Sequence, residues 1–131
     1  MKDFPTDGPA DCRFCRANGL LIDTPLAEMD HFYVLGSIEA HRPHQAMIVP
    51  YRHIETPFEL NAEEWAEIGA ALNFVKARFD AVGAAGYTVG WNVGASAGQD
   101  VLHAHLHVIA RFAGEPSEGL GIHAQFRSTK A

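Results

Sequence analysis

The apolar residues of this chain recur with two different periods, and each period predicts one type of element. Short apolar or alternating runs, which are typical of β-strands, occupy residues 20–23, 31–36, 45–49, 87–92 and 102–109. Pro50 ends the third run, because proline has no N–H to donate to a strand ladder. The pattern therefore predicts a sheet of about five strands.

One segment has the period of a helix instead. Asn61 and Glu64 have the spacing of a capping box, which starts a helix, and Gly83 is a natural terminator. The residues that form an apolar stripe between them are Trp65, Ile68, Leu72, Val75, Phe79 and Val82. We expect this stripe to lie in the core. Strands arranged around one long helix predict an α+β domain with a mostly antiparallel sheet.

The two ends of the chain lack a clear pattern. A length of 131 residues suits one compact domain, so residues 1–131 are expected to form a single domain. We expect residues 1–11 to form a loose arm, and a short N-terminal helix or turn to run from Cys12 to Asn18-Gly19. Residues 112–131 are expected to form a tail that closes over a site or reaches a partner.

Charge and composition exclude several kinds of partner. The formal net charge is −6 and the lysines and arginines do not cluster, so binding to DNA or RNA is not expected. No segment has the apolar length of a membrane span or the character of a secretory leader. We therefore expect a cytoplasmic protein in which both cysteines, Cys12 and Cys15, are reduced.

The stretch from Gly98 to Ile109 carries the strongest chemical signal. His103, His105 and His107 alternate with small and aliphatic residues, so on a strand their side chains would share one face. Imidazole titrates near neutral pH and can act as a base, a nucleophile or a metal ligand. A single histidine in a strand is usually structural, but three on one face indicate a functional site.

The sequence offers two candidate metal sites. A metal held by all three of these histidines is disfavoured, because ligands two residues apart on a straight strand span too far to enclose one ion. Cys12 and Cys15 have the spacing of a zinc site, and histidines must supply the other ligands because the chain has only 2 cysteines. The alternative is a reduced, metal-free pair that packs as two small apolar side chains.

The histidine pattern resembles the signature of the histidine triad (HIT) family. The segments that carry the resemblance are Ile48–His53, Asn92-Val-Gly94, Gly98-Gln99 and His103-Ala-His105-Leu-His107-Val-Ile. The early pair Cys12-x-x-Cys15 and the intervening helix also fall in the family's order, so the resemblance covers residues 12–111. The chain looks most like the compact bacterial nucleotide-binding branch of that family.

This resemblance implies an HIT-like fold, commonly paired into a homodimer, that acts at the α-phosphate of a small nucleotide such as AMP, a phosphoramidate, a dinucleotide or an adenylylated compound. His105 would attack phosphorus, and water would release a nucleoside monophosphate from the covalent nucleotidyl-histidine. The implied catalytic residues are His44, His103, His105 and His107, and the implied nucleotide contacts are Asn92, Gly98, Gln99 and Asp100.

Such a reaction places two demands on the site. One ring nitrogen of His105 must be free to attack, so an acceptor such as a strand carbonyl must hold the other. Developing charge on the phosphoryl oxygens must meet donors, which His107, Gln99 and the N–H groups of residues 94–98 are placed to supply.

The chain departs from the family pattern at three places. Asp100 stands where a serine or threonine commonly donates to the phosphate, and a carboxylate there repels an anion. Gly36 stands where relatives often carry an acid for the ribose hydroxyls, a role that Glu39 could take. Pro43 replaces the glycine that usually precedes the histidine at His44. The alternative to an enzyme is therefore a nucleotide-binding or sensing module with little turnover.

The resemblance also implies a ligand set for the metal. In relatives with the cysteine pair, the histidine of the Pro-x-x-His segment and the first triad histidine complete the site, which here means Cys12, Cys15, His53 and His103. Such a site would hold one structural zinc per chain. It would leave His105 and His107 free for a reaction that needs no metal.

Overall fold

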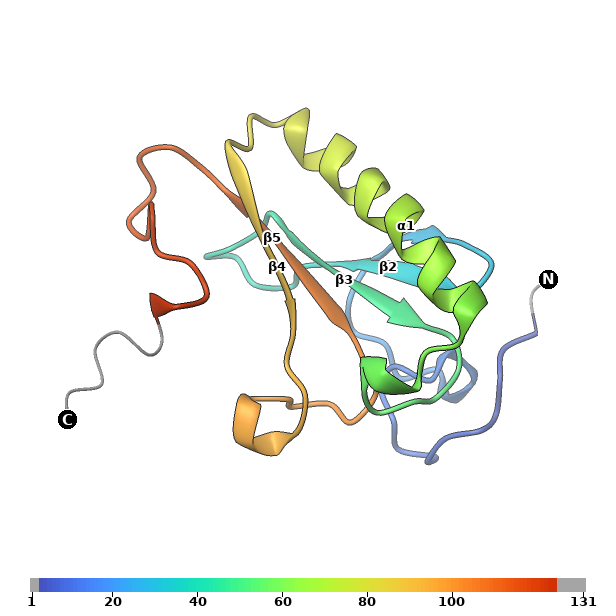
Figure 1. Ribbon diagram of the computed structural model, residues 1–131. Helices are drawn as coiled ribbons and strands as arrows, with labels where there is room; N and C mark the ends of the chain where they lie inside the picture. The colour runs from blue at the N-terminus through green and yellow to red at the C-terminus, as the bar shows by residue number, and fades with distance from the viewer. Residues whose placement is uncertain (1–2, 125–131) are drawn as a thin grey trace.

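The computed structural model describes residues 3–124. Five strands form one sheet in the order β1-β2-β3-β5-β4, and every neighbouring pair is antiparallel. The strands are β1 (Pro25–Glu28), β2 (Phe32–Gly36), β3 (Gln45–Pro50), β4 (Gly86–Trp91) and β5 (Leu106–Arg111). One long helix, α1 (Ala62–Asp80), lies against β2, β3 and β5 (Figure 1). The expected α+β class and five-stranded antiparallel sheet are confirmed.

Helix α1 begins with the predicted capping box. The Asn61 side chain accepts a hydrogen bond from the Glu64 N–H at 2.8 Å, and the Glu64 carboxylate accepts one from the Asn61 N–H at 2.9 Å. The apolar residues that α1 buries against the sheet are Ile68, Ala71, Val75 and Phe79.

Two members of the predicted apolar stripe do not lie in the core. Trp65 is 50% exposed, and Val82, which follows the end of α1, is 53% exposed. Glu64 takes the inward position of the first turn, where its buried carboxylate binds Arg52 at 2.8 Å and 3.0 Å. Trp65 is the next residue round the helix and therefore faces solvent. A pattern of apolar residues does not reveal a buried charge of this kind.

The first and last strands differ from the predicted ranges. Residues 20–23 form no strand, and β1 begins at Pro25. β5 begins at Leu106 rather than at residue 102, because the Ala104 N–H donates to the Ile54 carbonyl at 2.7 Å and not to a neighbouring strand. Of the three histidines, only His107 therefore belongs to β5, while the other two precede it.

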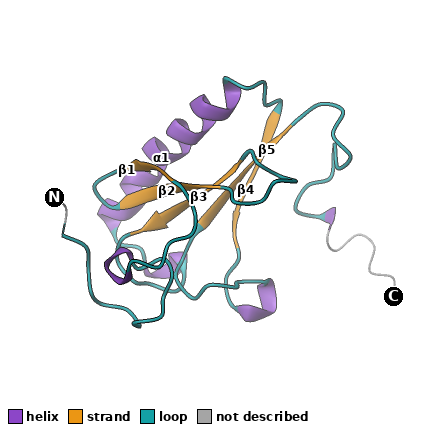
Figure 2. Cartoon of the chain, turned by 180° about the vertical axis from the view of Figure 1, so that it is seen from behind, coloured by secondary structure: helices purple, strands orange, loops and turns teal. Residues whose placement is uncertain are grey.

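The two faces of the sheet carry different clusters of buried side chains. The face covered by α1 is largely aliphatic and includes Val34, Ile48 and Val108. Figure 2 shows the molecule from behind, on the side of the sheet away from α1. The residues buried on this opposite face are Cys12, Phe14, Cys15, Tyr33, Leu35, Val49 and Tyr51. Because side chains alternate along a strand, His107 faces this second cluster, away from α1.

Both ends of the described chain contact the sheet domain. Although residues 3–11 form no helix or strand, they are not loose: Phe4 stacks on Tyr51 with ring centroids 5.6 Å apart. At the other end, Arg111 binds Glu115 and the Ser117 carbonyl, which holds the start of the tail. The predicted tail beyond residue 124 and the first two residues of the arm lie outside the described residues.

Two shorter features complete the fold. The expected short N-terminal helix is the 3-10 turn η1 (Arg16–Asn18), which ends at Gly19 with a φ of 67°, as predicted. Within residues 3–124, no helix has both the length and the hydropathy needed to cross a membrane.

We expect Glu64→Gln to lower the free energy of unfolding at pH 7 by about 1–3 kcal/mol, because it weakens a buried charge-assisted pair with Arg52. Burial alone would raise the pKa of Glu64, but the Arg52 guanidinium and the Asn61 N–H hold that pKa below its usual range. A carboxylate with a lowered pKa contributes stability above the unfolded-state pKa of about 4.3, and this contribution is lost as the pH falls through the folded-state value.

Urea unfolding at pH 7 and at pH 3 measures this effect, and the gap between Glu64→Gln and the wild type should narrow at pH 3. The control is Glu63→Gln, in the exposed first turn of α1, which should change stability little. Equal losses in the two variants would contradict the prediction.

Candidate functional site

His105 has one ring nitrogen bound and the other free. Its Nδ1 lies 2.8 Å from the carbonyl oxygen of His103, so the Nδ1–H donates to that oxygen and Nε2 keeps its lone pair. A backbone carbonyl is the kind of acceptor expected from the sequence. His105 is 4% exposed, and its Nε2 lies 3.7 Å from Asp100 Oδ1. The ring therefore presents its Nε2 toward a carboxylate.

His107 lies next to His105, with the two ring centroids 4.8 Å apart. Burial, and secondly the nearby His105, lowers the pKa of His107 below its ordinary value, so its ring is neutral at pH 7. Its buried Nε2 has no hydrogen-bond partner within residues 3–124. A neutral ring with an unpaired buried nitrogen is suited to bind a ligand atom.

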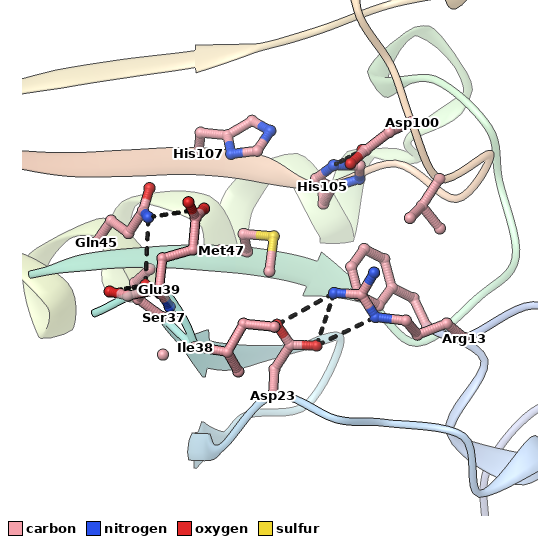
Figure 3. A pocket seen from close by; sticks show the side chains of 14 residues that line it. Arg13, Asp23, Ser37, Ile38, Glu39, Gln45, Met47, Asp100, His105 and His107 are labelled. Carbon is pink, nitrogen blue, oxygen red and sulfur yellow. Dashed lines mark hydrogen bonds and ion pairs between the residues drawn. The ribbon is translucent and has the colours of Figure 1, made fainter. Parts of the chain in front are cut away.

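Both rings line a cavity of about 290 Å³ on the sheet face opposite α1 (Figure 3). This volume is close to the lower end of the range for small-molecule sites. Apolar side chains form much of the wall, among them Phe14, Ile38 and Met47. The cavity is therefore a small, partly apolar pocket with two imidazoles on one side.

Two further polar groups line the same cavity. The Gln45 amide lies 3.2 Å from Ser37 Oγ and 3.5 Å from Glu39 Oε1. Arg13 and Asp23 form an ion pair with a shortest distance of 2.9 Å. Figure 3 shows these groups across the pocket from the two histidines.

A second cavity, of about 590 Å³, lies on the other side of His107. Asn92 at the end of β4 lines it, together with tail residues such as Ser117 and Ile122. The described part of the tail thus reaches the neighbourhood of the histidines.

Four sulfur and nitrogen atoms meet beside the first pocket. Cys12, Cys15, His53 and His103 each offer one ligand atom, and these atoms all lie within 4.8 Å of one another. The separations are 3.5 Å and 3.6 Å from the two sulfurs to His103 Nδ1, 3.3 Å from Cys15 Sγ to His53 Nδ1, and 3.2 Å between the nitrogens. Ligand atoms around a tetrahedral Zn²⁺ are about 3.3–3.8 Å apart. The sequence-predicted set therefore forms a cluster compatible with zinc.

The surroundings of the cluster favour a bound cation. His103 Nε2 donates to the Pro50 carbonyl at 2.8 Å, which leaves the Nδ1 lone pair facing the cluster. Burial, and secondly the neighbouring Cys12, raises the pKa of the Cys15 thiol to about 12. A thiolate in such a place needs a compensating positive charge, which a metal ion supplies. The arrangement also shows that His103 points away from any three-histidine metal site.

Comparison with known proteins identifies the family. The model of the HIT domain matches residues 22–114. The chain belongs to the HIT family. The five-stranded sheet with one long helix is therefore the HIT-like fold that the resemblance implied.

Three solved structures illustrate the relationship. A Zn-bound histidine triad family protein from Mycobacterium smegmatis is 25% identical, covers 83% of this chain and 81% of its own, and has a TM-score of 0.71. A hypothetical histidine triad nucleotide-binding protein from Sulfolobus tokodaii is 28% identical (79% and 71% covered, TM-score 0.68). A HIT family hydrolase from Clostridium thermocellum is 25% identical (83% and 97% covered, TM-score 0.65).

The position of His44 in this HIT domain differs from the prediction. Its ring lies 5.9 Å from Phe79 and 5.5 Å from Phe112 between centroids, on the α1 side of the sheet, and it does not line the pocket of His105. The next residue, Gln45, begins β3 and lines that pocket instead. Neighbouring residues of a strand point to opposite faces of the sheet, so a prediction that is wrong by one position assigns the wrong residue to the pocket face.

Gln99 supports the loop rather than the pocket. Its Oε1 accepts the Gly94 N–H at 2.8 Å, and its Nε2 donates to the carbonyls of Glu55 at 2.7 Å and Val101 at 3.1 Å. Both of its polar atoms are therefore bound to backbone within the protein. Gly98, with a φ of 93°, ends the short turn η3 (Ala95–Ala97) and so turns the chain toward Asp100, which does line the pocket.

Several pocket residues were not predicted from the sequence. Arg13 lies between the two cysteines, and this place in the sequence is the one signal that could have drawn attention to it. Its partner Asp23, and Ser37, carry no pattern that distinguishes them from ordinary loop residues. Gln45 could be identified from the sequence only if it were known which residues of β3 point to the pocket side of the sheet.

Gly8→Ala is expected to lower the free energy of unfolding by about 1–3 kcal/mol. A Cβ at this position would lie 2.6 Å from both Cys15 Sγ and His53 Cγ, so the arm or the cluster must shift. Thermal and urea unfolding of the purified protein measure the change.

Gly69→Ala is the matched control, because a Cβ there meets nothing within 4 Å and the position is inside α1. This change should raise stability by about 0.5–1 kcal/mol, since alanine is the better helix former. A Gly8→Ala variant as stable as the wild type would show that the arm does not pack tightly on the cluster.

Proposed function

We propose that this HIT protein is a nucleotide hydrolase or nucleotidyltransferase that acts at the α-phosphate of a small nucleotide through a covalent nucleotidyl-His105. The observation that carries the proposal is the free Nε2 of His105, held in one tautomer by the His103 carbonyl and facing a small pocket. Membership of the HIT family supports it, as do relatives described as a nucleotide-binding protein and as a hydrolase.

The reaction proceeds in two displacements. His105 Nε2 donates its lone pair to phosphorus, and the leaving group departs with the electrons of its own bond and takes up a proton from solvent. Water then attacks phosphorus and gives up a proton to solvent, the P–N bond breaks, and the electron pair returns to Nε2 as a nucleoside monophosphate leaves. His107 supplies an N–H to a phosphoryl oxygen, because its buried nitrogen has no other partner in the described chain.

Asp100 selects the leaving group. Its carboxylate is 80% exposed and lies 3.7 Å from the attacking nitrogen. It repels an anionic leaving group such as a nucleotide or pyrophosphate and tolerates a neutral or cationic amine. A nucleoside phosphoramidate or another small nucleotidylated compound is therefore the preferred substrate class.

The sugar of the nucleotide has candidate partners in the Ser37–Glu39–Gln45 group. A carboxylate accepts hydrogen bonds from hydroxyl groups, and Glu39 lines the pocket although Gly36 has no side chain to offer. Glu39 thus takes the place of the acid that the family pattern led us to expect at Gly36.

We also propose that the Cys12–Cys15–His53–His103 cluster holds one structural zinc per chain, which the relative from Mycobacterium smegmatis supports. The zinc would neutralise two thiolates and take no part in the reaction. The protein is further proposed to act as a cytoplasmic homodimer, on the resemblance to its family.

A nucleotide-binding module with little turnover is the second candidate function, favoured by the carboxylate of Asp100 beside the attacking nitrogen. The two candidates differ in whether a covalent adduct forms.

Incubation with AMP phosphoramidate should give a protein adduct of AMP by mass spectrometry and release of AMP. His105→Ala should abolish the adduct and lower turnover by at least about 10³-fold, because the nucleophile is gone. His31→Ala, at a histidine that lines neither of the two cavities beside His107, is the control and should retain both. Tight AMP binding by the wild type without adduct or turnover would favour the binding module instead.

Elemental analysis of protein never exposed to chelator should find about one zinc per chain. Cys12→Ala should lower the zinc content and reduce Tm by more than about 5 °C, while His41→Ala should change neither. Wild-type protein without stoichiometric metal would reject the zinc site and leave the proposal for His105 standing.

A further inference from the structure

The pocket of His105 has an ion pair at its far side. Arg13 Nη2 lies 2.9 Å and 3.2 Å from the two carboxylate oxygens of Asp23, and Arg13 Nε lies 3.3 Å from Oδ1. Both residues line the cavity that contains His105 and His107. Figure 3 shows the pair on the opposite side of the pocket from the histidines.

The pair leaves one edge of the guanidinium free. Asp23 binds the edge formed by Nε and Nη2, and Nη1 has no partner within residues 3–124. The Asp23 side chain is 2% exposed, whereas that of Arg13 is 30% exposed. Asp23 is thus the buried support that holds the guanidinium, and Arg13 is the member that a ligand can reach. The Nη1–Nη2 edge offers two parallel N–H donors.

The Phe14 ring restricts the guanidinium further. The Arg13 Cζ lies 4.7 Å from the centroid of this ring, which also lines the pocket. Between Asp23 and Phe14 the guanidinium has few other orientations, so its free donors point in a defined direction.

Charge decides what kind of group these donors fit. The charge of Arg13 is already balanced by Asp23, and the other ionisable acids of the pocket are Glu39 and Asp100. A second phosphate at this end would meet a net negative wall. A neutral group with two adjacent acceptors suits the site better, and a nucleobase edge is such a group.

We propose that Arg13 is a specificity-determining residue that selects a 6-oxopurine, guanine or hypoxanthine, over adenine. The inference rests on the proposed function, which places the α-phosphate at His105 and so directs the base toward the far side of the pocket. The O6 and N7 atoms of a 6-oxopurine accept from both donors of an arginine edge, whereas adenine presents an amino group in place of O6. Asp23 is a positioning residue that acts through Arg13.

Calorimetric titration of the full-length protein with GMP, IMP, AMP and CMP tests the proposal. GMP and IMP should bind at least about fivefold more tightly than AMP, the lower limit for a good bidentate contact. Arg13→Lys keeps the charge but loses the fork, so it should bring the GMP and AMP affinities within about twofold of each other. Circular dichroism and Tm show whether each variant folds.

Arg16→Lys is the matched control. Arg16 also forms an ion pair, with Glu28 at 3.1 Å, but its guanidinium contacts the rings of Phe4 and Tyr33 and does not line the pocket. This variant should keep the preference for GMP. Asp23→Asn, which leaves Arg13 in place but weakens its support, should reduce that preference without abolishing nucleotide binding.

Three outcomes of the titrations would overturn the inference. Equal affinity for all four nucleotides, a preference for AMP or CMP, or a GMP preference that survives in Arg13→Lys would show that Arg13 does not read the base. If the His105 adduct with AMP phosphoramidate still forms in those cases, the proposed function is kept and only the inference about Arg13 is lost. Absence of both nucleotide binding and the adduct would remove the proposed function and this inference together.

Discussion

The hydrogen bond from His105 Nδ1 to the His103 carbonyl is the contact on which the site depends. It fixes the tautomer of the ring and leaves Nε2 as the only nitrogen with a lone pair. Both residues precede β5, so no strand ladder holds the carbonyl in place. The His103 ring does so instead, because its Nε2 is bound to the Pro50 carbonyl and its Nδ1 faces the cysteine cluster. The cysteine cluster and the His105 ring are therefore linked through His103.

The sheet separates two kinds of chemistry. On the α1 face, aliphatic side chains supply most of the apolar burial and need no particular orientation to do so. On the opposite face, aromatic rings, thiols and imidazoles contact one another at defined angles; Phe14, for example, meets His105 edge-on with centroids 5.1 Å apart. Strand alternation allows both because it assigns neighbouring residues to opposite faces. The same alternation makes the site sensitive to a shift of a single residue.

Local patterns predicted the fold well and the pocket less well. The capping box at Asn61 and the strand pattern depend on neighbours in sequence, so they could be read directly. The apolar stripe predicts that Trp65 lies in the core, because it cannot show that Glu64 takes the inward position to bind Arg52. His44 was expected in the pocket, but the facing of β3, which a sequence alone fixes only to within a residue, places Gln45 there.

The charged residues that line the pocket lie on loops, and not on the sheet or on α1. Arg13, Asp23, Glu39 and Asp100 line a cavity whose other residues are mostly apolar or small, and none of the four belongs to a strand or to α1. A charge on a loop alters what the pocket binds at little cost to the core, because the backbone of the sheet does not depend on it. Family membership therefore identifies the fold, whereas the proposed choice of ligand rests on these loop residues. A carboxylate 3.7 Å from the free nitrogen of His105 and an arginine supported by a buried acid would both favour the ligand that we propose, with a single phosphate and a polar, uncharged far end.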